Sequence, residues 1–274
     1  MKNSVIVLIT IHLIMVCCNA FGGNGPRQGS AASHGIGGAT TTFSDSWSVQ
    51  NNQGALAFNE KLSLGISTQN YYLTGGVQQS NFSFSAPIKN QGIGGLGYSI
   101  IGISGYNEQR ATVAFSRKFG PAVGLGIGMN LVSVNAGEYG KQRTALVEAG
   151  LLIKLAPSLI SAAHLYNPNR AKLNPYNDER IPTVFSIGLQ YLASEKVKFL
   201  ADIENDLYYK SRLKAGVQYQ PIKALTIRMG LSTQPQVFSF GIGINLQQFS
   251  FDFASPFHQV LGPSPAAGFY YQAK

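Results

Sequence analysis

Alternation of large apolar residues with very small or polar ones constrains the fold of this chain more than any other sequence feature. In the stretch VFSFGIGINLQQFSFDFAS, residues 237–255, every second residue from Phe238 to Leu246 is bulky and apolar, and the residues between are serine, glycine or asparagine. The rhythm restarts at Phe249 after two glutamines. A period of two residues indicates a β-strand with one apolar and one small polar face.

The same alternation recurs from Lys61 to the end of the chain and predicts fourteen strands. We expect them to start near residues 60, 77, 92, 108, 122, 144, 158, 183, 196, 210, 224, 237, 248 and 266. Every second connection is short: Ile88 to Gln91, Lys118 to Pro121, Ala156-Pro157, Ala193 to Glu195, Pro221 to Lys223 and Gln247-Gln248. Longer connections fall between them, such as Asn135 to Arg143, Asn167 to Pro182 and Ser255 to Pro265.

An even number of strands of about ten residues, with short turns at one end and longer loops at the other, is typical of a transmembrane antiparallel β-barrel. Lipid offers no hydrogen bonds, so every backbone group must pair with a neighbouring strand and the sheet must close. The alternative is a soluble all-β sandwich, but its outer face should carry Lys and Glu rather than Gly, Ser and Asn. Aromatic girdles are expected from Tyr71, Tyr72, Tyr98, Tyr139, Tyr191, Tyr208, Tyr209, Tyr219, Tyr270 and Tyr271.

Composition supports a membrane environment. Charged residues make up 12% of the chain, about half the usual share for a soluble globular protein. The net charge of +9 comes from Lys and Arg scattered through the sequence. Because these residues do not cluster and no binding motif accompanies them, we expect no nucleic-acid partner.

Residues 1–20 have the pattern of a cleaved secretory signal peptide. Lys2 precedes an apolar run from Val5 to Val16, and a small-x-small cleavage site ends at Ala20. Acylation of Cys17 or Cys18, as in a lipoprotein, is an alternative. Both cysteines lie in this leader, so the mature chain is expected to lack disulfides and cysteine-bound metal. A barrel behind a secretory signal is expected in the outer membrane, with lipid as its surroundings.

Residues 21–59 do not follow the strand pattern and are expected to form an N-terminal plug or hatch inside a barrel of residues 60–274. The segment is rich in small residues and contains the single tryptophan, with a short helix expected near 47–51. A flexible tail is the alternative, but a tail has little use for large apolar residues. The residues expected in the plug are Phe43, Asp45, Trp47, Asn51 and Asn52.

Residues suited to catalysis or metal binding are scarce. His34, His164 and His258 lack the spacing of a metal site, and no nucleophile elbow or phosphate-binding loop occurs. We therefore expect no enzymatic activity and no cofactor. The charged residues on the polar face of the strands should face the lumen, because an Arg or Lys facing lipid costs about 2–4 kcal/mol. They are Arg110, Glu148, Lys154, Lys198, Asp202, Glu204, Lys214, Arg228 and Asp252. Pairing among themselves and with the plug is favoured over an open conducting lumen.

Two stretches resemble the FadL-like outer-membrane barrels of Bacteroidota, the PorV/PorQ group. The first is GIGGATTTFSDSWSVQNNQGALAF, residues 35–58, which leads directly into a strand; Asn52-Gln53-Gly54-Ala55 stands where the family has an Asn-Pro-Ala-like turn. The second comprises Asn167-Pro168, Ala171-Lys172-Leu173 and DERIPT, residues 178–183, running into SIGLQY, residues 186–191. The resemblance implies a fourteen-stranded barrel with an N-terminal hatch.

The resemblance implies two alternative functions. PorV-type members serve type IX secretion and receive cargo at the cell surface, whereas FadL-like members move small hydrophobic ligands through a lateral opening. We expect the former, a non-enzymatic barrel in type IX secretion or surface-protein handling, with transport as the alternative. Secretion-system or cell-surface proteins would then be partners of the long loops. The expected contact residues are Asn167, Arg170, Lys172, Glu179, Arg180 and His258.

Overall fold

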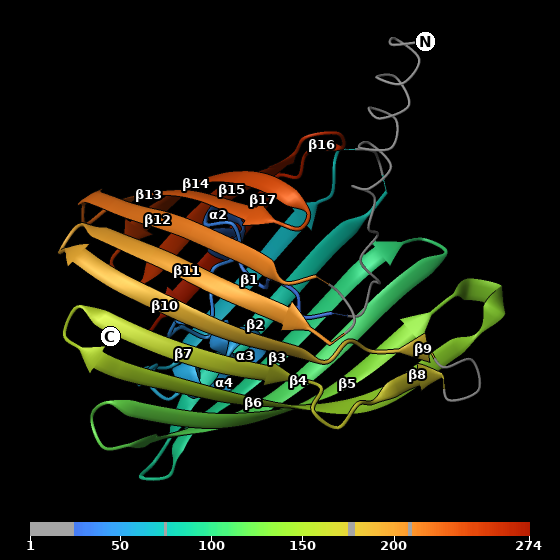
Figure 1. The fold of residues 1–274 in the computed structure, drawn as a ribbon, viewed down its shortest axis with the longest axis horizontal. Helices are drawn as coiled ribbons and strands as arrows, with labels where there is room; N and C mark the ends of the chain where they lie inside the picture. Colours follow the sequence, from blue (N-terminus) through green and yellow to red (C-terminus); the bar gives the residue numbers. More distant parts are fainter. Residues whose placement is uncertain (1–24, 74–75, 175–178, 208–209) are drawn as a thin grey trace, which may run out of the picture.

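The chain forms a closed antiparallel β-barrel (Figure 1). A computed structural model describes residues 25–73, 76–174, 179–207 and 210–274. The expected signal peptide, with Cys17 and Cys18, and the girdle residues Tyr208 and Tyr209 lie outside the described residues. Within them, fourteen strands pair in sequence order around the wall, and β1 closes the ring against β17. The predicted fold class is confirmed.

Each predicted strand corresponds to an observed one. The wall consists of β1 (Ser63–Asn70), β2 (Gln78–Ile88), β3 (Gly92–Ile103), β4 (Tyr106–Phe119), β5 (Val123–Asn135), β6 (Lys141–Ala156), β7 (Leu159–Tyr166), β10 (Val184–Ser194), β11 (Val197–Asp206), β12 (Arg212–Ile222), β13 (Leu225–Thr233), β14 (Gln236–Leu246), β15 (Phe249–His258) and β17 (Ala266–Gln272). The register confirms the hairpin of residues 237–255: Leu246 pairs with Phe249, and Gln247 has a positive φ of 53° in the turn between them.

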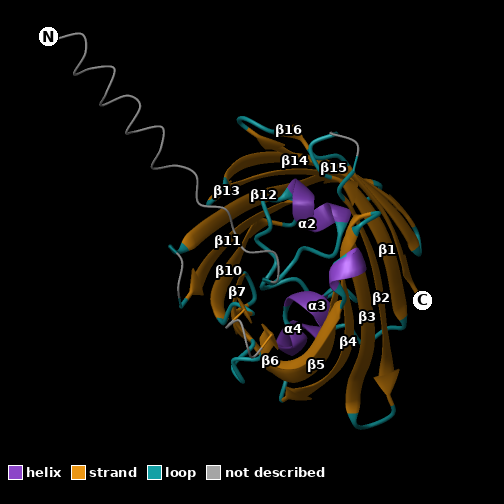
Figure 2. Ribbon diagram, turned by 90° about the vertical axis from the view of Figure 1, so that its right-hand side faces the viewer, coloured by secondary structure: helices purple, strands orange, loops and turns teal. Residues whose placement is uncertain are grey.

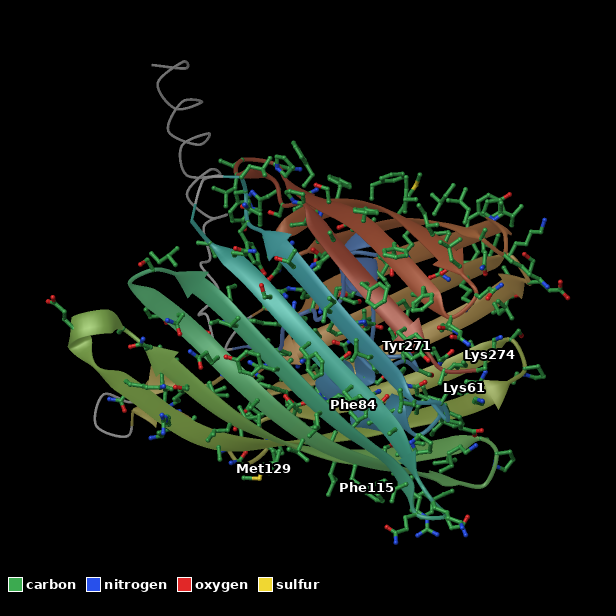
Figure 3. All side chains as sticks on the ribbon, turned by 180° about the vertical axis from the view of Figure 1, so that it is seen from behind. Lys61, Phe84, Phe115, Met129, Tyr271 and Lys274 are labelled. Atoms are coloured by element: carbon green, nitrogen blue, oxygen red, sulfur yellow. The ribbon has the colours of Figure 1, made fainter. Side chains whose placement is uncertain are left out.

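The two ends of the barrel differ in their connections. At one end, here called the short-turn end, six connections span two or three residues each, and the chain enters β1 and leaves β17 there. Lys61 and Lys274 lie together at this end (Figure 3). The opposite, long-loop end carries the connections β1–β2, β5–β6, β7–β10, β11–β12 and β15–β17, although residues 104–105 and 234–235 also form tight turns there.

Short elements that the sequence pattern does not predict occur in the long loops. They are the hairpin of β8 (Lys172–Asn174) with β9 (Glu179–Arg180), the strand β16 (Gly262–Pro263) on β15, and the 3-10 helix η1 (Gly137–Tyr139). The hairpin belongs to the largest loop, which packs on the barrel: Ile181 is buried together with Leu146 and Tyr166.

The outer face of the wall is apolar, as the alternation predicts. Met129 and Phe115 point away from the barrel (Figure 3), with 58% and 40% of their surfaces exposed. Of the expected girdle residues, Tyr98, Tyr191 and Tyr219 are exposed on this face. The girdle prediction is wrong for Tyr71 and Tyr270, which line cavities of the lumen. A continuous apolar exterior on a closed sheet is the surface that a bilayer requires. Among the described helices, none is long and apolar enough to cross a membrane.

The N-terminal segment, residues 25–59, lies inside the ring of strands (Figure 2). It contains α2 (Ala31–Gly35), α3 (Ser48–Asn51) and α4 (Gln53–Leu56). The helix expected near residues 47–51 corresponds to α3, whereas α2 and α4, of five and four residues, were not predicted. The role of this segment as a plug stays a prediction.

Candidate functional site

The N-terminal segment runs through the lumen from the long-loop end to the short-turn end. At the long-loop end Arg27 forms an ion pair with Glu108 of β4, and the carbonyl oxygen of Gln28 accepts a hydrogen bond from Gln79 at 3.0 Å. At the short-turn end Asn59 donates to Ser63 at 2.6 Å and to Ser85 at 2.8 Å. Both ends of the segment are therefore fastened to the wall.

Small residues on the inner face of the wall make room for α4. A Cβ atom added to Gly54 would lie 2.5 Å from the Cα of Leu151, and one added to Gly150 would lie 2.5 Å from the nitrogen of Gly54. An ordinary carbon contact is about 3.5–4.0 Å, so neither position accepts a side chain. The glycines that line this contact are Gly124, Gly126, Gly128 and Gly150. Glycines at period two thus provide lumen space that the N-terminal segment fills.

Glu148 is the polar centre of this contact. Its carboxylate accepts hydrogen bonds from Gln53 at 2.6 Å and Asn130 at 2.7 Å, and lies 3.0 Å from the Nε2 of His164. Only 2% of Glu148 is exposed. A buried carboxylate is tolerated only when its oxygens are bonded, and here three partners share them.

Most other charged residues of the strands also pair inside the lumen. Arg110 donates to the Gly25 carbonyl oxygen at 2.9 Å, and Asp202 accepts from the backbone nitrogen of Thr41 at 3.0 Å. The remaining pairs are Glu204 with Lys214 at 2.5 Å and Arg212 at 3.4 Å, and Arg228 with Asp252 at 2.5 Å. The arrangement is that of charges paired with each other and with the N-terminal segment.

Two lysines from the same predicted set behave differently. Lys154 is exposed at the short-turn end, where its Nζ atom lies 4.1 Å from the centroid of the Phe58 ring. Lys198 is half-buried and lines a cavity. Among the described residues it has no hydrogen-bond or ion-pair partner.

The five residues predicted in the plug all lie in the N-terminal segment, in different surroundings. Phe43 packs on the buried Ile36 and Leu200, and Trp47 is buried, with its ring against Gly65. Asn52 is fully buried and donates to the Thr41 carbonyl oxygen at 2.7 Å. Asn51 is half-buried, and its side-chain nitrogen has no hydrogen-bond partner among the described residues.

Burial shifts two titratable groups of the N-terminal segment in opposite senses. Burial raises the pKa of the Asp45 carboxyl to about 6, although this carboxyl accepts a hydrogen bond from the Trp47 nitrogen at 2.9 Å. Burial lowers the pKa of the His34 imidazole to about 4. The His34 Nε2 atom has no partner among the described residues. Both groups are costly to hold in their charged forms.

Cavities lie toward both ends of the lumen. At the short-turn end a cavity of about 310 Å³ lies between the N-terminal segment and the strands β10 to β15. At the long-loop end, cavities of about 230 Å³ and 360 Å³ share Pro26 and Arg27 as lining residues. The N-terminal segment therefore contributes to the walls of all three.

The predicted loop residues take different places. Asn167 is fully buried and donates to the Ile181 carbonyl oxygen at 2.9 Å, so it organises its loop rather than presenting a surface. Arg170, Lys172 and Arg180 are exposed, whereas the side chain of Glu179 lies outside what is described. The His258 Nδ1 atom accepts from the backbone nitrogens of Val260 and Leu261, both at 3.2 Å.

Three residues of the polar interior, Glu108, Asn130 and His164, were not predicted from the sequence pattern. Glu108 lies two residues before Arg110 in the same strand and therefore on the same face, so the alternation could have predicted that it faces the lumen. His164 reaches Glu148 only through the β6–β7 register, in which it stands opposite Gly150. No group of His, Cys, Asp and Glu in the described part of the chain is suited to holding a metal ion.

Comparison with known proteins supports the fold. No family model and no curated protein matches the sequence. The chain is similar to a solved mutant of the TodX monoaromatic hydrocarbon channel, with a TM-score of 0.68 and 13% identity over 90% of this chain and 99% of that one. It is also similar to the CymD monoaromatic hydrocarbon channel (0.67, 13%, 93% and 99%) and to a Pseudomonas aeruginosa FadL homologue (0.64, 12%, 92% and 98%). At these identities the likeness establishes a shared barrel architecture.

Proposed function

We propose that this protein is a non-enzymatic outer-membrane channel for small molecules. In the present conformation its N-terminal segment closes the channel. The observation that carries the proposal is the placement of cavities toward both ends of a lumen whose middle that segment fills. The two larger cavities, about 310 Å³ and 360 Å³, fall in the size range of small-molecule sites. Displacement of the segment would join them into one path.

The apolar exterior and the similar structures support this proposal. A closed barrel with a lipid-facing belt and tight turns at one end suits the outer membrane, with the short-turn end toward the periplasm. The similar solved proteins are named as hydrocarbon channels, which favours the transport alternative of the FadL-like resemblance. No catalytic role is assigned to any residue.

A reversible lock on the N-terminal segment tests the proposal. A Cβ atom added to Gly268 of β17 would lie 3.2 Å from the Cβ of Ala31 in α2, close to the spacing of a disulfide. In liposomes, the oxidised double variant Ala31→Cys with Gly268→Cys should pass small solutes more slowly than its reduced form. The single-cysteine variants serve as controls, because the leader contains the chain's only other cysteines. Equal flux with and without the lock would rule out gating by this segment, and absence of flux in all forms would rule out a channel.

The second candidate function is a PorV/PorQ-like role in type IX secretion or surface-protein handling. The observation that favours it is the described part of the loop between β7 and β10. Asn167 joins its two limbs through hydrogen bonds to the Ala171 nitrogen at 2.8 Å and the Ile181 carbonyl oxygen at 2.9 Å, and Asn169 accepts from the Val147 nitrogen of β6 at 3.1 Å. Arg170 and Arg180 project from this loop into the surroundings. Arg170, Lys172 and Arg180 form an exposed basic surface, here called the ledge, which at the cell-surface end is suited to contact with an acidic protein surface.

Site-specific cross-linking from the ledge tests this second function. A photoreactive residue at Lys172 should capture a secreted or surface protein in intact cells, while the same residue at Lys223, in an exposed turn at the opposite end, should not. Recovery of no partner from Lys172 counts against the secretion role.

A further inference from the structure

The cavity at the short-turn end has a polar wall on the side of the barrel strands. Lys198 of β11, Gln218 of β12 and Arg228 of β13 stand directly opposite one another in the strand register and form a row across three strands. The Nε atom of Arg228 lies 3.3 Å from the Gln218 side-chain oxygen. All three side chains line the same cavity.

Arg228 is neutralised, and Lys198 is not. The Nη1 atom of Arg228 reaches Asp252 of β15 at 2.5 Å, passing over Gly243, where an added Cβ would come within 2.8 Å of it. Lys198 has no such partner among the described residues. A half-buried ammonium group that lines a cavity without a counter-ion favours an anion there.

Amide and hydroxyl groups complete the wall beside these charges. Gln190 accepts from Thr42 at 3.5 Å through its side-chain oxygen, and Ser250 donates to Asn245 at 2.9 Å. The side chains of Gln190, Gln218 and Asn245 therefore offer further donors and acceptors to a bound molecule. Such groups suit a ligand that carries many hydroxyl groups.

The opposite wall belongs to the N-terminal segment and is partly aromatic. Phe43 and Trp47 line the cavity from this side, and Tyr270 of β17 lines it at the edge. Asp45 also faces the cavity, with one carboxylate oxygen bonded to the Trp47 nitrogen at 2.9 Å. An aromatic surface opposite a polar wall suits the C–H face of a sugar ring, and the Asp45 carboxylate can accept a hydrogen bond from a sugar hydroxyl.

The surroundings of the cavity are positively charged. Exposed lysines at the short-turn end include Lys61, Lys154, Lys196, Lys223 and Lys274, against the exposed acids Glu60 and Glu195. Such an excess raises the local concentration of anions near the mouth of the lumen. The excess of exposed lysines and the unpaired charge of Lys198 therefore both favour binding of an anion.

We propose that this cavity is a binding subsite for a small hydroxyl-rich carboxylate, such as a sugar acid, with Lys198 as the residue that binds its carboxylate. The proposal rests on the proposed channel function and names the class of solute, which differs from the hydrocarbons named for the similar channels. Gln190, Gln218 and Asn245 would bind the hydroxyl groups, and Phe43 and Trp47 would lie against the ring. The volume of about 310 Å³ accommodates one sugar unit with bound water.

Tryptophan fluorescence offers a direct test, because Trp47 is the only tryptophan and lines the cavity. Titration of the purified full chain in detergent with D-glucuronate should give a saturable change, with calorimetry as the second readout. D-glucose lacks the carboxylate and benzoate lacks the hydroxyl groups, so both should bind at least about tenfold more weakly, the loss expected when one charge-assisted hydrogen bond is removed.

A matched pair of lysine variants locates the site. Lys198→Gln should weaken D-glucuronate binding about tenfold or more and leave D-glucose binding unchanged, and Lys198→Arg should restore part of the affinity. Lys223→Gln removes a charge at the same end outside the cavity and should have little effect. No saturable binding, equal affinity for benzoate, or equal effects of the two glutamine variants would each overturn the proposal.

Measurement of solute flux in liposomes distinguishes failure of the subsite proposal from failure of the channel proposal. Saturable, Lys198-dependent binding without solute flux in liposomes would retain the subsite and reject the channel. Flux of small solutes without D-glucuronate binding would retain the channel and reject the subsite.

Discussion

The Nε2 atom of Gln53 lies 2.6 Å from the carboxylate of Glu148 and joins α4 to the wall of the barrel. The same carboxylate accepts from Asn130 and lies beside His164, so one buried charge organises groups from β5, β6, β7 and the N-terminal segment. Removing one partner of a buried charge leaves the others unsatisfied. Loss of this contact should therefore destabilise both the N-terminal segment and the adjoining strands of the wall.

Glu148→Gln should loosen the N-terminal segment. The new amide would present its NH₂ group to the NH₂ group of either Gln53 or Asn130, because these two donors bond different carboxylate oxygens. The remaining bond would lose its charged acceptor, and hydrogen bonds to a charged acceptor contribute about 1.5–3 kcal/mol each. We expect a loss of about 2–4 kcal/mol in the free energy of unfolding, measured by urea titration in lipid vesicles. Glu195→Gln, in an exposed turn, is the control, and equal stability of the two variants would contradict the assignment.

Gly54→Ala should displace α4 although alanine is the better helix former. The gain in helix propensity is about 1 kcal/mol, whereas the added Cβ would lie 2.5 Å from backbone atoms of Gly150 and Leu151 that cannot rotate away. Overpacking of this kind costs about 1–3 kcal/mol, so we expect a net loss of stability and faster cleavage of the N-terminal segment by protease. Gly105→Ala, which meets nothing within 4 Å, should behave as wild type.

Strand positions followed from the sequence because each strand has one lipid-facing side. Phe238 to Leu246 alternates without a break, and the outward residues are exposed as predicted. The path of the N-terminal segment could not be predicted in this way. Gly54 packs against glycines of the wall and Ala55 against Leu152 and Ala162, and such contacts of small residues leave no periodic pattern.

The polar interior was predictable in part. The two-residue alternation predicts Glu148 and Arg228 on the inner face, because a charge facing lipid is costly. Their partners depend on register between distant strands: Gly243 faces Asp252, and Arg228 of β13 reaches Asp252 across β14. Sequence reasoning alone does not supply that register, and for this reason the uncompensated position of Lys198 emerged only from the structure.

Opposite pKa shifts in the N-terminal segment predict that the contributions of His34 and Asp45 to the pH dependence of stability nearly cancel between about pH 4 and 6. The folded-state pKa of His34 is about 4, below its ordinary 6.5, so stability from the neutral imidazole is present above pH 6.5 and is lost as the pH falls toward 4. The folded-state pKa of Asp45 is about 6, above its ordinary 3.8, so stability from the protonated carboxyl is lost as the pH rises from 3.8 to 6.

Single substitutions of Asp45 and His34 should reveal the contribution of each residue to the pH dependence of stability. Relative to wild type, the stability of Asp45→Asn should rise with pH between 3.8 and 6, and that of His34→Gln should fall with pH between 4 and 6.5, each by on the order of 1–3 kcal/mol. Urea titrations followed by Trp47 fluorescence at several pH values measure both slopes. If the stability difference from wild type changed with pH in the same direction for both variants, the opposite pKa shifts of the two groups would be contradicted.

Met129→Lys should destabilise the barrel in a bilayer. Met129 lies at the middle of β5 on the outer face, where its register neighbours Val113 and Val147 are also exposed and apolar. A lysine at the bilayer midplane costs about 2–4 kcal/mol, so the free energy of unfolding in vesicles should fall by about that amount. Val260→Lys, at the tip of a loop with 85% of its surface exposed, should leave stability unchanged. If Met129→Lys were as stable as Val260→Lys, the outer face would be in water, as in the soluble sandwich, and the transmembrane placement of the barrel would be refuted.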